Sequence, residues 1–541
     1  MKISRVKIKN FKCLGPEEIK FDFSDDIIIL IGKNNTGKSS VLKALDYFFS
    51  GIKTIPDDYF YNQLTDFDHA IVIEVEFNNL SSQDKEHQAV SSYYYDNEDE
   101  ETWTLRKVYY KDEDGKGVCD YICIKGGEEL GNPAGRQTNV DDLFTDEKMQ
   151  KIYVEAVKEV TEASQTAAKS TFGQLFNLLL KPELEVTGEY KSLMSAIDDY
   201  RNLFQGGNKL NKIKELEQTI NNRVARIISV SSKIDAEPPK ADKVLPVPKL
   251  LTNDNRDIDV LPEQQGNGFQ RTLIFALLEL LAESTSIPDD DMVGPRNIVL
   301  IEEPEIYMHP QMERRIADVL YKIASDKKAQ VICTTHSPVF INISDKQKSL
   351  ARMIRETDKV TVIQKIENIF SDPGADNKRK LLKMIGNFDP TTNEAFFADR
   401  VVLVEGHTEI AVMRESAELV SYFDSPDNFE KKRSTTFINC RSRDSIPAFQ
   451  EVLNYFKIDY VVLHDKEGED LTSGTNGKIL DLLGGDESRR KVSTDKIENI
   501  LGITAGGNKE LAAVNRVNEL HNNSRLDRVF GDYIKFVYNI N

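Results

Sequence analysis

The sequence predicts an α/β protein that forms two successive parallel sheets, and three observations lead to this fold class. The segment 26–32 is a continuous apolar run, as in a strand that is covered on both faces. After residue 260, strands and helices alternate, which is typical of a parallel sheet. A second alternating series begins near residue 395, so we expect a second α/β domain with its own sheet.

The composition limits the class of protein. A chain of 541 residues corresponds to about three domains at roughly 100–200 residues each. The net charge of −19 does not indicate nucleic-acid binding, so any such partner needs local basic patches or metal ions. No apolar run approaches the roughly 18 residues that cross a bilayer, and the five cysteines resemble no disulfide framework. We therefore expect a cytoplasmic protein without a membrane partner.

Changes in residue pattern divide the chain into four segments. We expect residues 1–139 to be the N-terminal part of the first domain and residues 241–394 to be its C-terminal part. Between them, residues 140–240 have helical composition and a narrow apolar stripe, which predicts a helical insertion that contributes to dimerisation. Residues 395–541 are the expected second α/β domain.

The stretch GKNNTGKS at residues 32–39 follows a predicted strand and opens a predicted helix. This is the P-loop pattern, in which backbone N–H groups surround phosphate oxygens, Lys38 reaches the β and γ phosphates and Ser39 binds Mg²⁺. The residues predicted to hold ATP here are Gly32, Asn34, Asn35, Gly37, Lys38, Ser39 and Ser40.

Two adjacent carboxylates end the predicted strand at residues 297–302. Because neighbours on an extended chain point in opposite directions, Glu302 and Glu303 need different roles, one at Mg²⁺ and one at the attacking water. His336 ends another buried strand and is a candidate sensor of the γ-phosphate. A solvated acidic turn and a structural histidine are the alternative interpretations.

A second group of acids follows the later strands. Glu405 ends the apolar run 401–404, Glu409 comes four residues later, and Asp465 and Glu467 end the strand near residue 460. Parallel strands bring their C-terminal ends to one crevice, and clustered carboxylates need a hard cation such as Mg²⁺ or Mn²⁺ to neutralise them. We predict a metal centre that cleaves phosphodiesters, with simple helix capping as the alternative.

The motif order in the first domain resembles the ABC-type ATPases of the SMC and RecF-like group. The motifs are GKNNTGKS, QGNGFQR at 265–271, IVLIEEPEIYMHP and TTHSP. The resemblance implies that Glu302 is the Mg²⁺-side acid, Glu303 the catalytic base and His336 the switch histidine. It also implies a signature loop with Gly266 and Gly268 that reaches the nucleotide of a dimer partner. The glutamine of the family's further loop stays open between Gln63 and a nearby acid.

The later acids resemble a Toprim domain. VVLVEGHTE matches its glutamate motif, whereas LHDKE has Glu467 where the second Asp of the paired-aspartate motif is expected. An ABC-type ATPase with a helical insertion, followed by Toprim, resembles the OLD (overcoming lysogenization defect) nucleases, which act mostly in bacterial defence against phage. The metal-site residues that this resemblance implies are Glu405, Glu409, Asp465, Glu467 and Glu498, with Lys535 favoured over Lys509 as an accompanying lysine.

The resulting hypothesis is an ATP-binding, divalent-metal-dependent DNA endonuclease. The resemblance implies ATP and Mg²⁺ or Mn²⁺ in both sites, DNA as substrate and a homodimer or larger assembly. Related defence systems add a helicase, or a reverse transcriptase with its DNA, as a partner. The alternative is an ATP-driven nucleic-acid clamp whose Toprim domain is inactive.

Overall fold

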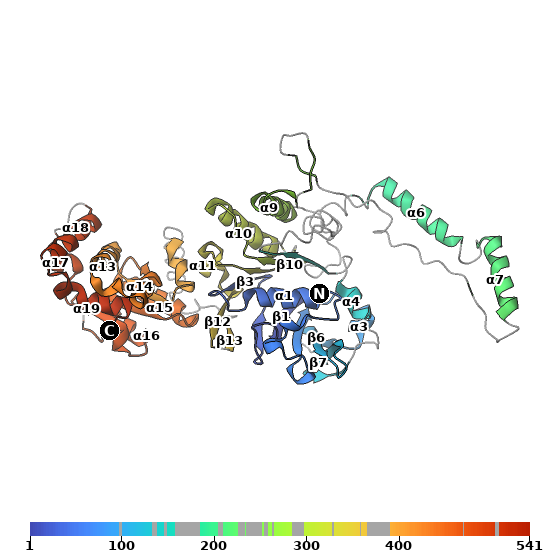
Figure 1. Ribbon diagram of the computed structural model, residues 1–541, viewed down its shortest axis with the longest axis horizontal. Coiled ribbons are helices and arrows are strands. Elements are labelled where there is room, and N and C mark those ends of the chain that lie inside the picture. Colours follow the sequence, from blue (N-terminus) through green and yellow to red (C-terminus); the bar gives the residue numbers. More distant parts are fainter. Residues whose placement is uncertain are drawn as a thin grey trace. The chain divides into compact units, whose positions relative to one another are not determined.

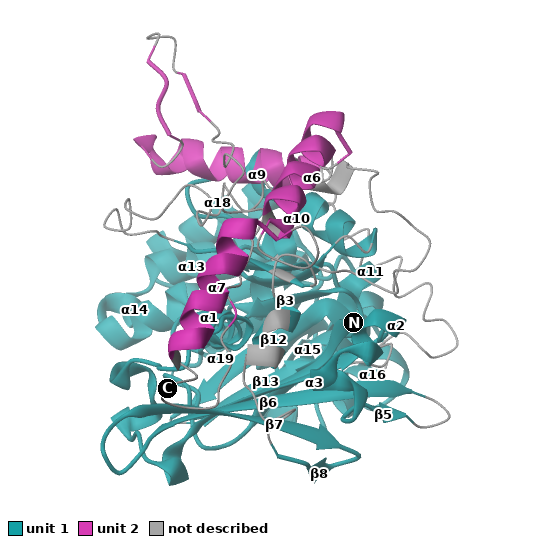
Figure 2. Ribbon diagram, turned by 90° about the vertical axis from the view of Figure 1, so that its right-hand side faces the viewer, with its two compact units in different colours: residues 1–156, 291–541 teal, residues 157–290 magenta. Residues whose placement is uncertain are grey.

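The structure is a computed structural model that separates into two compact units. One unit comprises residues 1–156 and 291–541, and the other comprises residues 157–290 (Figure 2). No helix among the described residues is both long and apolar enough to cross a membrane. The structure describes the chain except for residues 97–99, 132–137, 145–148, 157–183, 185, 204–208, 225–232, 234–250, 254–257, 262–263, 284–296, 327–328, 358, 365–389, 469, 504–507 and 541.

An antiparallel sheet occupies the N-terminal part of the first unit (Figure 1). In β1, Val6 and Ile8 are buried while Lys7 is partly exposed, which confirms the half-buried strand that the alternating sequence predicts. The order across this sheet is β2 (Ile19–Asp22), β1 (Lys2–Lys9), β4 (Ile71–Asn78), β6 (Glu101–Lys111), β7 (Gly117–Lys125) and β8 (Glu128–Glu129), with β5 (Tyr95–Asp96) paired to β6.

A second sheet carries the predicted nucleotide motifs. Its neighbouring strands are parallel except for the edge strand β13, which pairs antiparallel with β12. Because β3, β11 and β10 are adjacent, the segments that follow these three strands meet at one edge of the sheet. The order is β13 (Lys359–Gln364), β12 (Leu350–Glu356), β3 (Ile27–Ile31), β11 (Gln330–Thr334), β10 (Asn297–Glu302) and β9 (Gln150–Val154).

Strand β9 corrects one expectation from the sequence. The spacing of apolar residues predicts a helix that starts near residue 149, but Gln150–Val154 form a strand parallel to β10. Ile152 and Val154 are buried there, so pairing with a sheet edge outweighs local helical spacing for these β-branched residues. The rest of that predicted helix, from residue 157 to residue 180, lies outside the described residues.

Among the described residues, the second unit contains three long helices, α6, α7 and α9. There, α7 confirms helical structure in part of the segment 140–240, for which the sequence predicts a helical insertion. The dimerisation role of the insertion stays a prediction. The helices are α1 (Lys38–Phe49), α2 (Ser82–Glu86), α3 (Gln88–Ser91), α4 (Thr138–Asp141), α10 (Pro310–Ser325) and α11 (Ile343–Lys346) in the first unit, and α6 (Gly188–Asn202), α7 (Asn211–Val224) and α9 (Asn267–Glu283) in the second.

The C-terminal part of the first unit is a separate parallel sheet, as the second alternating series predicts. Its strand order is β15 (Thr435–Asn439), β14 (Arg400–Val404), β16 (Tyr460–Asp465) and β17 (Arg490–Ser493). Strand β14 lies between the two strands that follow it in the chain. The connection through α13 (His407–Leu419) therefore leads from β14 to β15 on one side of it. The connection through α15 (Ile446–Tyr455) leads back across to β16, on the other side of β14. The C-terminal ends of β14 and β16 flank this topological switch point, where open α/β sheets bind ligands.

Helices bury one face of this sheet. Val402 and Val404 of β14 and Leu463 of β16 form one apolar core with side chains from α13 and the last helices of the chain. This packing makes the sheet a rigid base for the residues at the strand ends. The remaining helices are α14 (Pro426–Arg433), α16 (Gly474–Leu482), α17 (Ile497–Leu501), α18 (Lys509–Asn522) and α19 (Leu526–Tyr538).

Candidate functional site

At two positions of the loop between β3 and α1, the backbone has a conformation that favours glycine. Gly32 has a φ of +149°, and a Cβ there would clash with the backbone carbonyl oxygen of Met353. Gly37 has a φ of +97°, and a Cβ there would lie 2.7 Å from a methyl carbon of Leu14. The fold itself therefore requires both glycines of the P-loop pattern, and their contact with phosphate stays a prediction.

The Lys38 side chain is folded back over this loop. Its ammonium donates to the carbonyl oxygens of Gly32 and Lys33, both at 2.9 Å. Burial lowers the pKa of Lys38 to about 8, and the charges of Glu303 and Glu305 act against that shift. Of the other predicted loop residues, Asn34, Asn35 and Ser39 are exposed, whereas Ser40 is buried with its hydroxyl 3.4 Å from the thiol of Cys13.

Glu302 and Glu303 point in different directions, as their adjacency predicts. The carboxylate of Glu302 accepts from the Tyr153 hydroxyl at 2.8 Å and from the Ala156 N–H at 3.3 Å. Glu303 has a φ of +40°, and one of its carboxylate oxygens lies 3.4 Å from Nε2 of His336. The structure thus brings Glu303 and His336 together and turns Glu302 toward β9. The Mg²⁺ role of Glu302 stays a prediction.

Sequence reasoning missed Glu305. Its carboxylate accepts the backbone N–H of His336 at 2.6 Å, and burial raises its pKa. It also acts electrostatically on Lys38, so it belongs to the same edge of the sheet. The only signal in the sequence was a third acid two residues after Glu303.

The predicted signature loop lies in the other unit. Gly266 precedes α9 and Gly268 is in its first turn, so this segment opens a helix. The approach of these glycines to a nucleotide stays a prediction. Gln63 ends a short 3₁₀ turn and is exposed, which leaves its role open as well.

A second set of acids, the carboxylate site, comprises Glu405, Glu409, Asp465, Glu467 and Glu498. Glu405 follows β14 and Asp465 ends β16, and the Asp465 backbone N–H donates to the Glu405 carboxylate at 2.6 Å. Burial and, to a smaller extent, the charges of neighbouring carboxylates together raise the pKa of each acid to about 7. Glu409, in the first turn of α13, is 6% exposed, and burial raises its pKa too. The predicted convergence of Glu405 and Asp465 is therefore present.

Glu498 reaches the same region from α17. The Thr408 hydroxyl donates to its carboxylate at 3.4 Å, and the Lys509 ammonium lies 3.7 Å from it. The Lys535 ammonium instead lies 5.4 Å from the centre of the Tyr422 ring. These contacts favour Lys509 as the lysine beside the acids, and the identity of that lysine stays a prediction.

The carboxylate site fits a Mg²⁺ or Mn²⁺ ion by its donor chemistry. Within the part of the chain that the structure describes, no group of three or more His, Cys, Asp or Glu side chains is arranged to hold a metal ion as it stands. Mg²⁺, however, is commonly bound through one or two carboxylates and several waters. Glu405 and Asp465 are two such carboxylates, and their raised pKa values reflect buried negative charge that a cation would stabilise.

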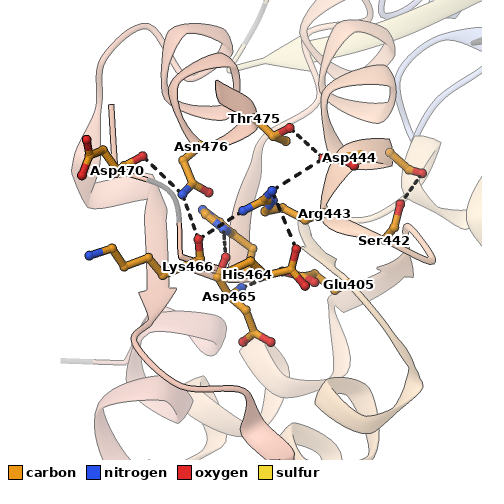
Figure 3. A network of polar contacts seen from close by, with 12 residues as sticks. Glu405, Ser442, Arg443, Asp444, His464, Asp465, Lys466, Asp470, Thr475 and Asn476 are labelled. Carbon is orange, nitrogen blue, oxygen red and sulfur yellow. Dashed lines mark hydrogen bonds and ion pairs between the residues drawn. The ribbon is translucent and has the colours of Figure 1, made fainter. Parts of the chain in front are cut away.

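Two cations beside the carboxylate site were also missed by sequence reasoning. The Lys496 ammonium donates to Glu467 at 3.2 Å, and a guanidinium nitrogen of Arg443 lies 3.7 Å from the other oxygen of Glu467. Arg443 enters from the loop after β15 and points at the turn after β16 (Figure 3). For Lys496, the available signal in the sequence was its position two residues before the predicted metal-site residue Glu498.

Comparison with known proteins identifies the two parts of the chain. The AAA ATPase domain family matches residues 1–115 and 136–341, which is more than half of the chain. The Toprim domain of the overcoming lysogenization defect protein-like family matches residues 396–466. The chain belongs to the OLD family. It is an ATPase joined to an OLD-like Toprim nuclease domain, which confirms the family and fold class predicted from the motifs.

Individual OLD-family relatives are distant but span most of the chain. The OLD nuclease of Thermus scotoductus is 23% identical over 480 residues, covering 86% of this chain and 82% of that protein. The Old nuclease of Escherichia phage P2 is 22% identical, covering 76% of this chain and 69% of the relative. Among solved structures, an SMC head bound to the C-terminal winged-helix domain of ScpA covers 68% of this chain at 14% identity, with a TM-score of 0.40.

Proposed function

We propose that this protein is an ATP-regulated, divalent-metal-dependent DNA endonuclease that cuts with its Toprim domain. The observation that carries the proposal is the pair of buried carboxylates, Glu405 and Asp465, at the switch point of the C-terminal sheet. Their position at the ends of adjacent parallel strands is where such sheets bind ligands. The names of two relatives, OLD nuclease and Old nuclease, support nuclease chemistry.

Glu405 and Asp465 would hold the cation, with Glu409 and Glu498 adding negative charge around it. A bound divalent ion supplies an activated water and charge stabilisation for phosphodiester cleavage. The hydrogen bond from the Asp465 N–H orients the Glu405 carboxylate. The apolar core under β14 and β16 limits movement of both acids, which favours a preorganised site.

The ATPase part would control the nuclease rather than cut DNA. Lys38 would bind the phosphates, Ser39 and Glu302 the Mg²⁺, and Glu303 would polarise the attacking water beside His336. The Glu303–His336 contact supports the last pairing. Sites of the ABC type close between two ATPase units, so we also propose a homodimer or larger assembly, with Gly266 and Gly268 in the shared site.

A plasmid assay tests the proposal. Supercoiled plasmid is incubated with the full-length protein in Mg²⁺, in Mn²⁺ or in EDTA, each with and without ATP. We expect nicked or linear DNA with either cation and intact plasmid in EDTA. Intact plasmid under all conditions, together with ATP-dependent DNA binding, would instead support the clamp alternative.

The biological role is proposed from the OLD family alone. We propose a function in anti-phage defence, with a helicase, or a reverse transcriptase with its DNA, as the type of protein partner. Plaque counts on a host that carries the wild-type gene or the Glu405→Gln variant test the role. Purification from the native host, followed by identification of bound protein and nucleic acid, tests the partner.

A further inference from the structure

Glu467 lies between two positively charged side chains. One of its carboxylate oxygens is 3.2 Å from the Lys496 ammonium, and the other is 3.7 Å from a guanidinium nitrogen of Arg443. Both oxygens therefore face protein cations, whereas the Glu405 carboxylate accepts a hydrogen bond from the Asp465 backbone N–H. The charge of Glu467 is compensated by the protein itself.

Arg443 also holds the backbone of the turn after β16. Its side chain is 8% exposed, and Nη1 donates to the Lys466 carbonyl oxygen at 3.1 Å. Asn476 donates to the same oxygen at 3.1 Å, so this carbonyl is held from two elements (Figure 3). A planar guanidinium can serve a carbonyl and a carboxylate together, which a single ammonium group cannot do with the same geometry.

This turn needs such support because its backbone is unusual. Glu467 has a φ of +49°, in the left-handed region that non-glycine residues adopt only at an energetic cost. The turn begins immediately after Asp465, whose N–H orients Glu405. A shift of the turn would therefore move Asp465 relative to Glu405, the two residues proposed to hold the cation.

We propose that Arg443 is a positioning residue of the carboxylate site and that Glu467 is its counter-ion, rather than a direct ligand of the cation held by Glu405 and Asp465. This inference rests on the proposed function, because it concerns the same cation. It differs from the ligand role that the Toprim resemblance implies for Glu467, and it assigns to Arg443 a task that the sequence motifs do not.

The sign of the effect on metal affinity separates positioning from simple charge. A positive group near a cation site repels the cation, so removing the charge alone would tighten metal binding. Loss of a residue that orients metal ligands instead weakens binding by about 10–100-fold. Arg443→Gln therefore moves the affinity in opposite directions under the two explanations.

The experiment measures Mn²⁺ binding to nucleotide-free, full-length protein by electron paramagnetic resonance of the free ion. The Glu405→Gln/Asp465→Asn double variant defines binding outside the carboxylate site. We expect Arg443→Gln to bind Mn²⁺ about 10–100-fold more weakly than wild type and Arg443→Lys to remain weakened, because the lysine keeps only the charge. Arg441→Gln, an exposed arginine on the same loop, removes an equal charge and should retain wild-type affinity.

Glu467→Gln tests the second half of the proposal independently. As a counter-ion, Glu467 should be replaceable with less than about a tenfold loss of Mn²⁺ affinity, below the range for a residue that orients ligands. The Glu467→Gln/Arg443→Gln double variant should lose little more Mn²⁺ affinity than Arg443→Gln alone, because both substitutions break the same Arg443–Glu467 ion pair. Thermal unfolding in EDTA verifies that each variant is folded, and Glu467→Gln alone tests the counter-ion role where Arg443→Gln does not fold.

Four outcomes would overturn the inference. Unchanged or tighter Mn²⁺ binding by Arg443→Gln excludes positioning, and wild-type affinity of Arg443→Lys reduces its role to charge. A loss in Glu467→Gln as large as that in Glu405→Gln makes Glu467 a direct ligand. If wild type binds no more Mn²⁺ than the Glu405→Gln/Asp465→Asn blank, the proposed metal chemistry fails together with the inference, whereas the first three outcomes leave that chemistry intact.

Discussion

Replacing Glu405 by glutamine separates its charge from its shape. Glutamine keeps the side-chain oxygen that accepts the Asp465 N–H at 2.6 Å, so the local geometry should persist while one negative charge is lost. Loss of one such electrostatic element typically lowers the rate by about 10²–10³-fold, or about 2.7–4 kcal/mol of transition-state stabilisation. We expect this reduction in the rate of plasmid cleavage by Glu405→Gln in Mg²⁺ or Mn²⁺.

The assay compares initial rates of plasmid nicking at saturating metal and DNA. Glu418→Gln is the matched control, because Glu418 lies on α13, the helix that begins just after Glu405, but is exposed and pairs with Lys432. The control should cut at the wild-type rate, and both variants should bind and hydrolyse ATP normally, because the P-loop belongs to a different sheet. Undiminished cleavage by Glu405→Gln would refute the assignment of the carboxylate site.

Three further predictions concern the ATPase part. Burial lowers the pKa of Lys38 to about 8, and phosphate binds the charged amine, so ATP affinity measured by calorimetry in EDTA should fall as the pH rises through about 8. Lys38→Arg should show a flatter profile, and equal pH dependence in the two proteins would contradict this reasoning. Glu303→Gln should bind ATP but release phosphate at a rate lower by about 10²–10³-fold, whereas a wild-type rate would exclude Glu303 as the base. Light scattering with and without ATP should give a mass of at least two chains, and a monomer under both conditions would count against a shared ATPase site.

The nucleotide loop could be predicted from sequence because its requirements are local. Gly32, Gly37 and Lys38 act through the backbone of one short loop, and the motif records that loop directly. Glu405 and Asp465 could be found for a related reason: each ends an apolar strand, and parallel strands place such ends together. The opposite directions of Glu302 and Glu303 follow from their adjacency in the same way, although their partners do not.

Other features depend on contacts between distant parts of the chain. Strand β9 was predicted as helix because its pattern fits both structures, and only pairing with β10, more than a hundred residues away, selects the strand. Arg443 and Lys496 lie 24 and 29 residues from Glu467, measured in opposite directions along the chain, and no local pattern links them. Glu305 likewise becomes relevant only through its bond to His336 on the neighbouring strand connection.

The sequence by itself determined the α/β class, the P-loop and the two strand ends that carry Glu405 and Asp465, because hydrophobic periodicity and loop motifs are properties of neighbouring residues. Tertiary structure alone decided which charges compensate one another. Ion pairing depends on distances of a few ångströms between side chains from different elements, and these distances are set by how strands and helices pack. The position of Glu467 between Arg443 and Lys496 is therefore a property of the fold that the linear order of residues does not contain.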